Sequence, residues 1–288
     1  MRLLTYHDDQ GVHIGALRDQ QVTALDGVAA DMLSLIDAGD AGMAAVRAAV
    51  AAATAWQPLA GLTLLAPIPR PRQNVVCVGL NYVAHSVESD RARGREHKLP
   101  SVPIFFTKAV TAVAAPWGEF VLDPHVTQQL DYEAELAFVI GRGGKNISRT
   151  DALDHVFGYM AANDISARDL QARHQQYFKG KSLDGSCPLG PWIVTADEIP
   201  DPSRLSVRLR VNGHPRQESS VSALIFDIPT LIESLSLGMT LEPGTIVCTG
   251  TPAGVGMGMT PPQFLQAGDV VETEIEAIGS LHTRIVAG

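Results

Sequence analysis

The segment from Asp131 to Ile140 carries two glutamates, Glu133 and Glu135, within an apolar run that is typical of a β-strand. Side chains alternate between the two faces of a strand, so both glutamates lie on one face. Two like charges this close repel each other unless a positive charge compensates them. Because carboxylates are preferred ligands of hard cations such as Mg²⁺, the pair is a candidate metal site. The alternative is a half-buried edge strand with two solvated acids.

Length and composition predict one large domain, or one large and one small. The 288 residues are 45% hydrophobic and 18% charged, which is typical of a folded globular protein. The net charge of −9 argues against general binding to nucleic acid or to an anionic membrane. The sequence has neither an apolar run of about 18 residues that could span a bilayer nor a secretory signal. Three widely spaced cysteines predict neither a disulfide framework nor a zinc motif, so we expect a cytoplasmic location.

A proline-rich stretch, residues 65–73, divides the chain and is typical of a stiff linker. The segment before it predicts a small N-terminal α/β domain, residues 1–68, and the rest predicts a catalytic domain, residues 69–288. We expect an α+β fold that is mostly β, with a mixed sheet. The predicted strands are 3–6, 13–17, 21–24, 74–79, 103–107, 133–140, 157–163, 190–195, 205–211, 245–249 and 268–276, and the predicted helices include 43–56, 148–154 and 228–236.

A second acidic position, Asp164, follows a predicted strand where the chain turns into a helix. Strand ends are common places for functional side chains. Arg168 and Gln171 come four and seven residues later, on one face of that helix. The arginine could clamp a carboxylate in a bidentate manner. The alternatives are that Asp164 caps the helix and that Arg168 makes a surface salt bridge.

His85 and Glu88 form a candidate acid–base pair. They lie three residues apart in a predicted helix that follows strand 74–79, so their side chains can touch. A carboxylate beside an imidazole fixes its tautomer, which suits a general base. A lone histidine near a helix start is more often structural, and the glutamate partner favours the catalytic interpretation.

Two further segments contain candidate residues. Lys181 lies in the Gly- and Pro-rich segment 177–192, a predicted loop, where it is either solvated or supplies positive charge to a developing oxyanion. Thr251 lies in a Gly-rich turn, where glycines let backbone amides approach a ligand closely. The sequence contains no dinucleotide fingerprint, P-loop or nucleophile elbow.

These segments, in this order, resemble the fumarylacetoacetate hydrolase family over residues 70–286. The motifs are Glu-x-Glu, Asn-Asp-x-Ser-x-Arg-Asp-x-Gln, Gly-Lys-Ser and Thr-Gly-Thr-Pro-x-Gly-Val-Gly. The resemblance implies a mixed β-roll catalytic domain, a Mg²⁺ or Mn²⁺ cofactor and a homodimer. It also implies metal ligands Glu133, Glu135 and Asp164, catalytic residues His85, Glu88 and Lys181, and substrate-binding residues Arg168, Gln171 and Thr251.

One departure from the family pattern narrows the branch. Fumarylacetoacetase has a fourth ligand, an aspartate, where this chain has Asn81, and it is a longer chain. The resemblance therefore implies the three-carboxylate, acylpyruvate-hydrolase-like branch, whose members hydrolyse, decarboxylate, hydrate or isomerise small 2-oxo acids.

The resemblance favours hydrolysis of the C–C bond of a 2,4-dioxo acid to pyruvate and a second acid. The 2-oxo acid head would chelate the metal, His85 would activate a water for attack at C4, and Lys181 would help to stabilise the pyruvate enolate. Arg168 and Gln171 would contact the distal end of the substrate. The alternatives are a metal-dependent lyase or isomerase of the oxaloacetate decarboxylase, ureidoglycolate lyase or 2-oxo-diacid isomerase type, and a non-catalytic metal-binding protein.

The charged segment 89–100 follows the helix that carries His85. We hypothesise that it is a lid that orders over the substrate, and the alternative is a solvated loop.

Overall fold

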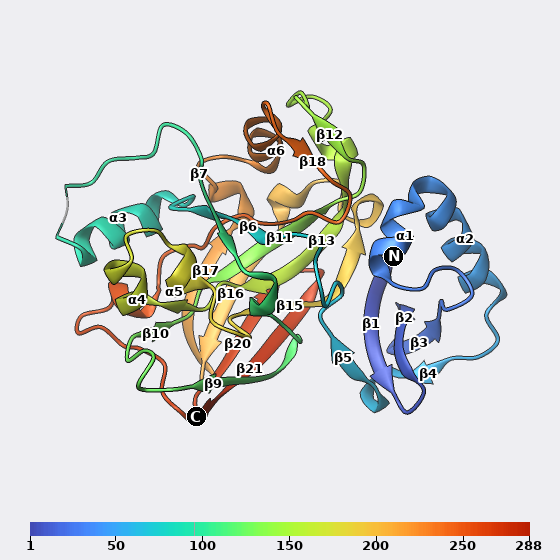
Figure 1. The fold of residues 1–288 in the computed structure, drawn as a ribbon, viewed down its shortest axis with the longest axis horizontal. Coiled ribbons are helices and arrows are strands. Elements are labelled where there is room, and N and C mark those ends of the chain that lie inside the picture. Colours follow the sequence, from blue (N-terminus) through green and yellow to red (C-terminus); the bar gives the residue numbers. More distant parts are fainter. Residues whose placement is uncertain (95) are drawn as a thin grey trace.

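The computed structural model describes residues 1–94 and 96–288, and strands outweigh helices in it (Figure 1). The strands are β1 (Arg2–Asp8), β2 (Gly11–Arg18), β3 (Gln21–Ala24), β4 (Gln57–Pro58), β5 (Thr63–Leu65), β6 (Val75–Gly79), β7 (Ile104–Lys108), β8 (Val113–Ala114), β9 (Trp117–Leu122), β10 (Leu130–Asp131), β11 (Ala134–Ile140), β12 (Gly144–Lys145), β13 (Val156–Asn163), β14 (Ser166–Ala167), β15 (Cys187–Thr195), β16 (Ser206–Val211), β17 (His214–Ser220), β18 (Thr240–Leu241), β19 (Ile246–Cys248), β20 (Val270–Ile275) and β21 (Gly279–Ala287). The α-helices of the described residues are α1 (Met32–Asp37), α2 (Gly39–Ala52), α3 (Val83–Ala92), α4 (Arg168–Arg173), α5 (Phe178–Lys181) and α6 (Ile228–Ser236).

Two mixed sheets form the body of the molecule. The larger sheet has the order β4-β3-β2-β1-β15-β13-β11-β19-β6-β7, with β5 paired to β1 and β8 to β15. The smaller sheet has the order β17-β16-β20-β21-β9. Both contain parallel and antiparallel pairs, as expected for the α+β, mostly β class. In the part of the chain that the structure describes, no helix combines the length and apolarity that crossing a membrane requires.

Strand β11 lies inside the larger sheet and is buried along its whole length. Leu136 and Phe138 on one face pack into a core that includes the smaller sheet. Ala137 and Val139 on the other face pack into a second core that includes α1. The predicted alternation is therefore confirmed, whereas the half-buried edge strand is wrong because both faces of this strand are covered.

The pairing of β11 brings several strand ends to one place. Its two neighbours, β13 and β19, both run antiparallel to it, so the start of β11 lies beside the ends of β13 and β19. Strand β6 runs parallel to β19, and its end therefore points the same way. Helix α3 follows β6, so the side chains of α3 lie near the place where these strand ends meet.

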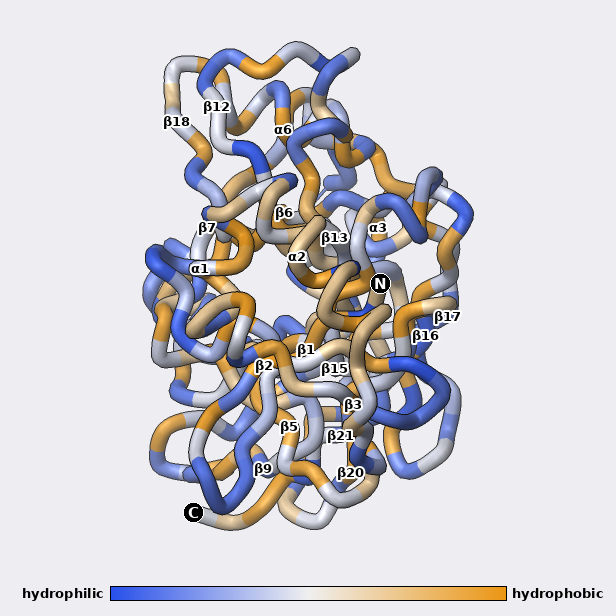
Figure 2. Tube along the Cα trace, turned by 90° about the vertical axis from the view of Figure 1, so that its right-hand side faces the viewer, coloured by the Kyte–Doolittle hydropathy of each residue, from blue (hydrophilic) through white to orange (hydrophobic). Residues whose placement is uncertain are grey.

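The N-terminal strands extend the larger sheet. Arg2 and Leu3 of β1 pair with Val194 and Ile193 of β15. In Figure 1 these strands form the blue lobe with α1 and α2, and in Figure 2 they lie toward the viewer. The predicted strands at 3–6, 13–17 and 21–24 are confirmed by β1, β2 and β3. The domain boundary at residue 68 stays a prediction.

Two predicted helices differ from the structure, and the one predicted at 228–236 is confirmed as α6. The helix predicted at 43–56 is α2, which follows α1 directly and ends where Ala53 turns extended. The helix predicted at 148–154 is a turn that leads into a 3-10 helix, Ala152–His155. The Ser148 hydroxyl donates to Asp151, and such local hydrogen bonds favour turns over helices.

The loop predicted at 177–192 is wrong over most of its length, because only Tyr177 and residues 182–186 belong to neither a helix nor a strand. The segment contains α5 and more than half of β15, which is buried throughout. Its prolines indicated a loop, but the pairing of β13 with β15 shifts register between Tyr159 and Ala161. Pro191 falls at this irregularity, where a strand tolerates a residue without an N–H.

Gly158→Ala should separate β13 from β15. A Cβ atom there would lie 2.4 Å from the carbonyl oxygen of Val194, which is backbone and cannot move aside alone. We expect the free energy of unfolding in urea to fall by about 1–3 kcal/mol, as in other overpacked cores. At Gly118 in β9 the nearest atom to a Cβ would be 3.9 Å away, so Gly118→Ala is the matched control. Equal stability of the two variants would contradict this account.

Candidate metal centre and active site

Three buried carboxylates meet where the start of β11 lies beside the ends of β13 and β19. Glu133, Glu135 and Asp164 each contribute one oxygen to a group in which all these atoms lie within 4.8 Å of one another. The strand register explains this, because Glu135 lies opposite Ala162 and the N–H of Asp164 donates to the carbonyl oxygen of Glu133 at 2.8 Å. The structure thus brings the three predicted metal ligands together, and their role as ligands stays a prediction.

Basic side chains surround two of these carboxylates. Lys181 Nζ lies 2.6 Å from Glu133 Oε2 and 2.6 Å from Asp164 Oδ2. Arg168 Nη2 lies 2.7 Å from Glu133 Oε1, and Lys108 Nζ lies 2.7 Å from Asp164 Oδ1. Part of the positive charge that the acids require therefore comes from the protein. Lys108 was not among the predicted site residues, since a lysine at the end of an apolar strand gives no signal of such a contact.

Glu135 differs from its two neighbours. It has no cationic partner among the residues that the structure describes, and its Oε2 accepts a hydrogen bond from the N–H of Gly250 at 2.7 Å. Burial and the nearby charges of Asp164 and Glu133 raise the pKa of Glu135 well above its ordinary value. Burial also raises the pKa of Glu133, but Lys181 and Arg168 outweigh burial, so this pKa lies below its ordinary value.

The donor set fits a hard divalent cation. An ionised carboxylate offers about four lone-pair sites. Glu133 and Asp164 each use two of them in ion pairs, and Glu135 uses one in its hydrogen bond to Gly250. Lone pairs therefore remain on all three side chains, and an all-oxygen set suits Mg²⁺ or Mn²⁺. A cation beside Glu135 would supply the positive charge that this carboxylate lacks.

His85 and Glu88 approach the cluster from α3. His85 Nδ1 lies 3.4 Å from Glu88 Oε2, and His85 lines the same cavity as Glu133. The Glu88 carboxylate also accepts hydrogen bonds from the N–H of Gly254, at 3.0 and 3.2 Å, which hold it in place. Within the described chain His85 Nε2 has no hydrogen-bond partner, so it is available for proton transfer.

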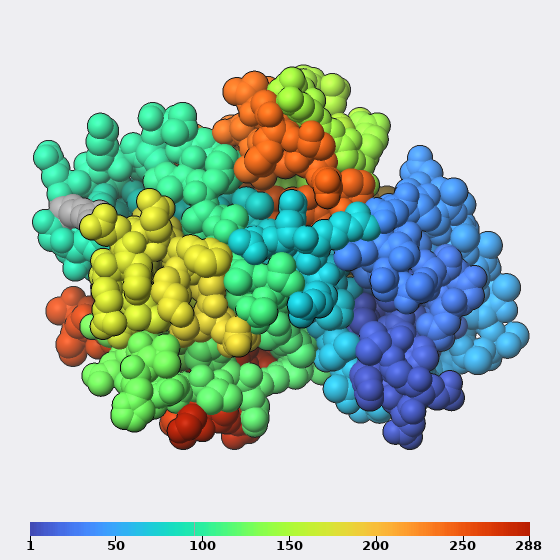
Figure 3. Space-filling view, viewed as in Figure 1, coloured from blue at the N-terminus to red at the C-terminus, as the bar shows by residue number. Residues whose placement is uncertain are grey.

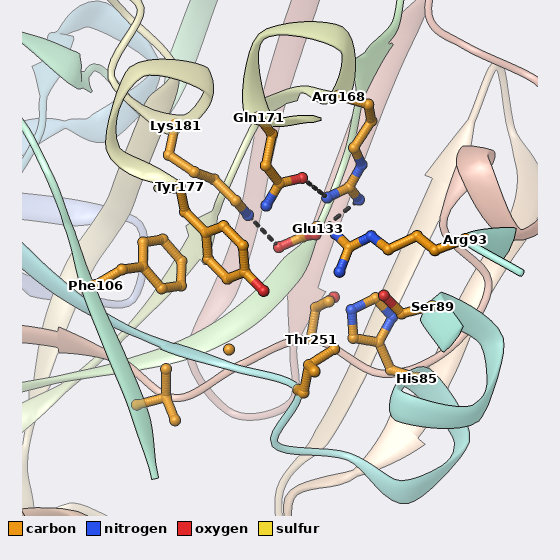
Figure 4. A pocket seen from close by; sticks show the side chains of 13 residues that line it. His85, Ser89, Arg93, Phe106, Glu133, Arg168, Gln171, Tyr177, Lys181 and Thr251 are labelled. Carbon is orange, nitrogen blue, oxygen red and sulfur yellow. Dashed lines mark hydrogen bonds and ion pairs between the residues drawn. The ribbon is translucent and has the colours of Figure 1, made fainter. Parts of the chain in front are cut away.

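A small cavity adjoins Glu133 of this cluster, and Figure 4 shows the side chains that line it. Its volume is about 20 Å³, which is room for about one water molecule. Three predicted site residues, Glu88, Glu135 and Asp164, do not line this cavity. They form hydrogen bonds with the backbone of Gly254, the backbone of Gly250 and the side chain of Lys181, respectively. Six of the predicted site residues line this cavity: His85, Glu133, Arg168, Gln171, Lys181 and Thr251.

Lys181 lies in a short helix, not in the predicted loop. Gly180 lets α5 pack tightly on α4, because a Cβ there would lie 2.6 Å from the backbone nitrogen of Gln171. These two helices form the yellow surface in Figure 3, beside the blue-green segment that follows α3. Burial lowers the pKa of Lys181, but Asp164 and Glu133 raise it above its ordinary value, so this side chain is a cation.

Arg168 is held by carboxylates of the protein. Its Nε donates to Asp131 Oδ2 at 2.9 Å, its Nη2 faces Glu133, and its Nη1 donates to Gln171 Oε1 at 3.3 Å. Burial lowers the pKa of Arg168, and the two carboxylates raise it above its ordinary value. The charge of Arg168 is thus balanced within the protein, and its predicted contact with substrate stays a prediction. Asp131 was not among the predicted site residues, because its function depends on a contact with a distant helix.

The Gly-rich turn after β19 donates its amides to carboxylates of the protein. The turn requires glycine at position 254, where φ is +105° and a Cβ would lie 1.9 Å from the carbonyl oxygen of Arg216. Thr251 accepts a hydrogen bond from Gln217 Nε2 at 2.8 Å. The acceptors for the N–H groups of Gly250, Gly254 and Gly256 are the side chains of Glu135, Glu88 and Asp131.

Asn81 has a structural role, apart from the acidic cluster. Its Nδ2 donates to the carbonyl oxygens of Thr249 and Phe226 at 2.8 and 3.1 Å, and its Oδ1 accepts from the N–H of Phe226. The position that distinguishes the three-carboxylate branch therefore contains an amide that bridges two segments of backbone.

The predicted lid, residues 89–100, includes Arg95, which lies outside the described residues. Ser89 belongs to α3 and lines the cavity, as does Arg93 just beyond the helix. The closure of this segment over substrate stays a prediction.

Comparison with known proteins defines the class. Residues 74–286 match the family model described as Fumarylacetoacetate (FAA) hydrolase C-terminal. The chain belongs to the fumarylacetoacetate hydrolase family and is an enzyme of that superfamily, which confirms the resemblance drawn from its motifs.

Particular relatives include tautomerases and hydrolases. Oxaloacetate tautomerase YisK of Bacillus subtilis (strain 168) is 52% identical over 227 residues, which cover 79% of this chain and 74% of YisK. The mitochondrial oxaloacetate tautomerase FAHD2A of Homo sapiens is 41% identical over 257 residues, 88% of this chain and 79% of that protein. Maleylpyruvate hydrolase from Sphingobium sp. SYK-6, solved with manganese (II) and pyruvate, is 30% identical with a TM-score of 0.81, and all of both chains is covered. This structural similarity confirms the predicted fold.

Glu135→Gln should abolish stabilisation by metal. The amide keeps the shape of the side chain but removes the carboxylate that has no cationic partner in the described structure. With Mn²⁺ at about 100 times its dissociation constant, wild-type protein should gain about 2.7 kcal/mol of stability, seen as a rise in Tm. The variant should show little of that rise, while the exposed-residue control Glu119→Gln keeps it. An unchanged rise in Glu135→Gln would exclude Glu135 as a ligand.

Proposed function

We propose that this protein is a divalent-metal-dependent enzyme that enolises a small 2-oxo acid, with keto–enol tautomerisation of oxaloacetate as its reaction. The observation that carries the proposal is that His85, which is paired with Glu88, and Glu133, which belongs to the buried carboxylate cluster, line one cavity. Similarity to oxaloacetate tautomerases at 52% and 41% identity supports the choice of reaction. Mg²⁺ or Mn²⁺ is the proposed metal, and the manganese complex of a structural neighbour supports it.

Tautomerisation moves one proton from C3 of oxaloacetate to the oxygen on C2. A divalent cation held by Glu133, Glu135 and Asp164 would polarise the 2-oxo group and stabilise negative charge on its oxygen. His85 accepts the C3 proton at Nε2, because Nδ1 faces Glu88. The electron pair left on C3 then forms the C2=C3 double bond, the π pair of the C2 carbonyl moves to its oxygen, and that oxygen takes up a proton from the protonated His85 or from water, with the net transfer of one proton. Lys181 adds fixed positive charge next to the developing enolate.

Hydrolysis of a 2,4-dioxo acid is the second candidate. The same His85–Glu88 pair could take a proton from water, which would attack C4 and break the C3–C4 bond. Similarity to maleylpyruvate hydrolase supports this alternative at 30% identity, less than the identity to the tautomerases. The homodimer and the cytoplasmic location remain predictions.

His85→Ala should lower kcat for oxaloacetate tautomerisation by about 10²–10⁴-fold, because it removes the proposed base. The assay follows the enol absorbance with Mg²⁺ or Mn²⁺ present, and a chelator should abolish the enzymatic rate. His282→Ala, at an exposed histidine in β21, is the control and should keep full activity.

The same samples separate the two candidates. Pyruvate release from acylpyruvates, measured with a coupled dehydrogenase, would favour the hydrolase. Tautomerisation that persists in His85→Ala, or that survives removal of metal, would overturn the proposed mechanism.

A further inference from the structure

We propose that Arg93 binds the distal carboxylate of a 2-oxo diacid and so selects diacids over monoacids. The inference rests on the proposed function and extends it to a residue that determines specificity. Arg93 lies at the C-cap of α3, where its backbone N–H donates to carbonyl oxygens of the last helical turn. Its neighbour Arg91 fixes this end of the helix by donating from Nη2 to the carbonyl oxygen of Gly258 at 3.0 Å.

Arg93 is the cavity cation that is not already committed to a carboxylate. Lys181 is paired with Glu133 and Asp164, and Arg168 is paired with Glu133 and Asp131. Among residues 1–94 and 96–288, no carboxylate pairs with Arg93. Its guanidinium carbon lies 6.0 Å from the ring centroid of Tyr177, and in Figure 4 the side chain points from the end of α3 toward the other cavity residues.

Arg93 also lies where two cavities adjoin. The narrow cavity over the acidic cluster and an outer cavity of about 800 Å³ are both lined by Arg93, Arg168, Gln171 and Tyr177. A substrate whose 2-oxo acid head faces the cluster would extend its other end toward these residues. The outer cavity is otherwise lined by apolar and uncharged side chains such as Phe264 and Met257. Its two charged residues are Arg93 and Arg168, and of these only Arg93 lacks a carboxylate partner in the described part of the chain.

The charges of the site explain why a diacid needs this residue. The acidic cluster repels the distal carboxylate of a diacid. The nearby cations, Lys181 and Arg168, do not offset this repulsion, because carboxylates of the protein already neutralise them. The Arg93 guanidinium, which has no carboxylate partner in the described part of the chain, can bind such a carboxylate through two parallel hydrogen bonds. Gln171 can assist, because its Oε1 accepts from Arg168 and its amide nitrogen remains available to donate.

Binding of inert analogues tests the inference without turnover. Malate and lactate are both 2-hydroxy acids, but only malate has a distal carboxylate. In calorimetry with Mn²⁺-loaded protein, Arg93→Gln should weaken malate binding by about 10- to 100-fold and leave lactate binding within about 2-fold. Arg93→Lys should give an intermediate loss, because it keeps the charge and loses the bidentate geometry. Arg173→Gln removes an exposed charge from α4 that lines neither cavity, and it should change neither affinity.

The outcomes separate this inference from the proposed function. Equal weakening of malate and lactate, unchanged malate binding in Arg93→Gln, or no preference of the wild-type protein for malate would each overturn the role of Arg93. If the wild-type protein prefers malate through Arg93 but does not tautomerise oxaloacetate, the carboxylate site stands and the proposed reaction fails. If tautomerisation occurs and Arg93→Gln keeps its kcat/KM, the reaction stands and the inference fails.

Discussion

Compensation of buried negative charge is the constraint on which the rest of this structure depends. Asp131, Glu133, Glu135 and Asp164 have relative exposures of 0%, 5%, 1% and 0%, and an unpaired carboxylate at such positions costs several kcal/mol. Three cations and the amides of one turn balance most of this charge. These partners come from β7, α4, α5 and the turn after β19. The four segments must therefore pack together before the acids can be buried with their charge balanced. Glu135 alone lacks a cation in the described chain, which is why the cluster is suited to metal.

Local sequence determined the features that depend on periodicity and on strand order. The alternation around Glu133 and Glu135 predicted which side chains share a face of β11, and the two cores on either side confirm it. The position of Asp164 directly after a strand predicted its proximity to them, because an antiparallel neighbour returns its end to the start of β11. The candidate residues could therefore be found from motifs and strand ends alone.

Features that depend on tertiary contacts could not be predicted in this way. Lys108 and Asp131 occupy ordinary positions in strands, and only the folded chain shows that they hold Asp164 and Arg168. The segment 177–192 has a loop composition, yet pairing with β8 and β13 makes the end of it a strand. The Gly-rich turn was expected to hold a ligand through its amides, but those amides hold carboxylates, a distinction that composition does not contain.

The contacts of His85 bear on the choice between tautomerase and hydrolase. Both reactions develop negative charge on the 2-oxo group, so the acidic cluster and Lys181 serve them equally well. They differ in what His85 contacts, since a hydrolase must place a water between the imidazole and the substrate, whereas a tautomerase places the C3 proton there directly. The inner cavity beside His85, about 20 Å³, has room for about one water, so either substrate would also occupy part of the outer cavity of about 800 Å³. The volume of the site therefore does not separate the two reactions, and the group that lies against His85 Nε2 when substrate is bound decides between them.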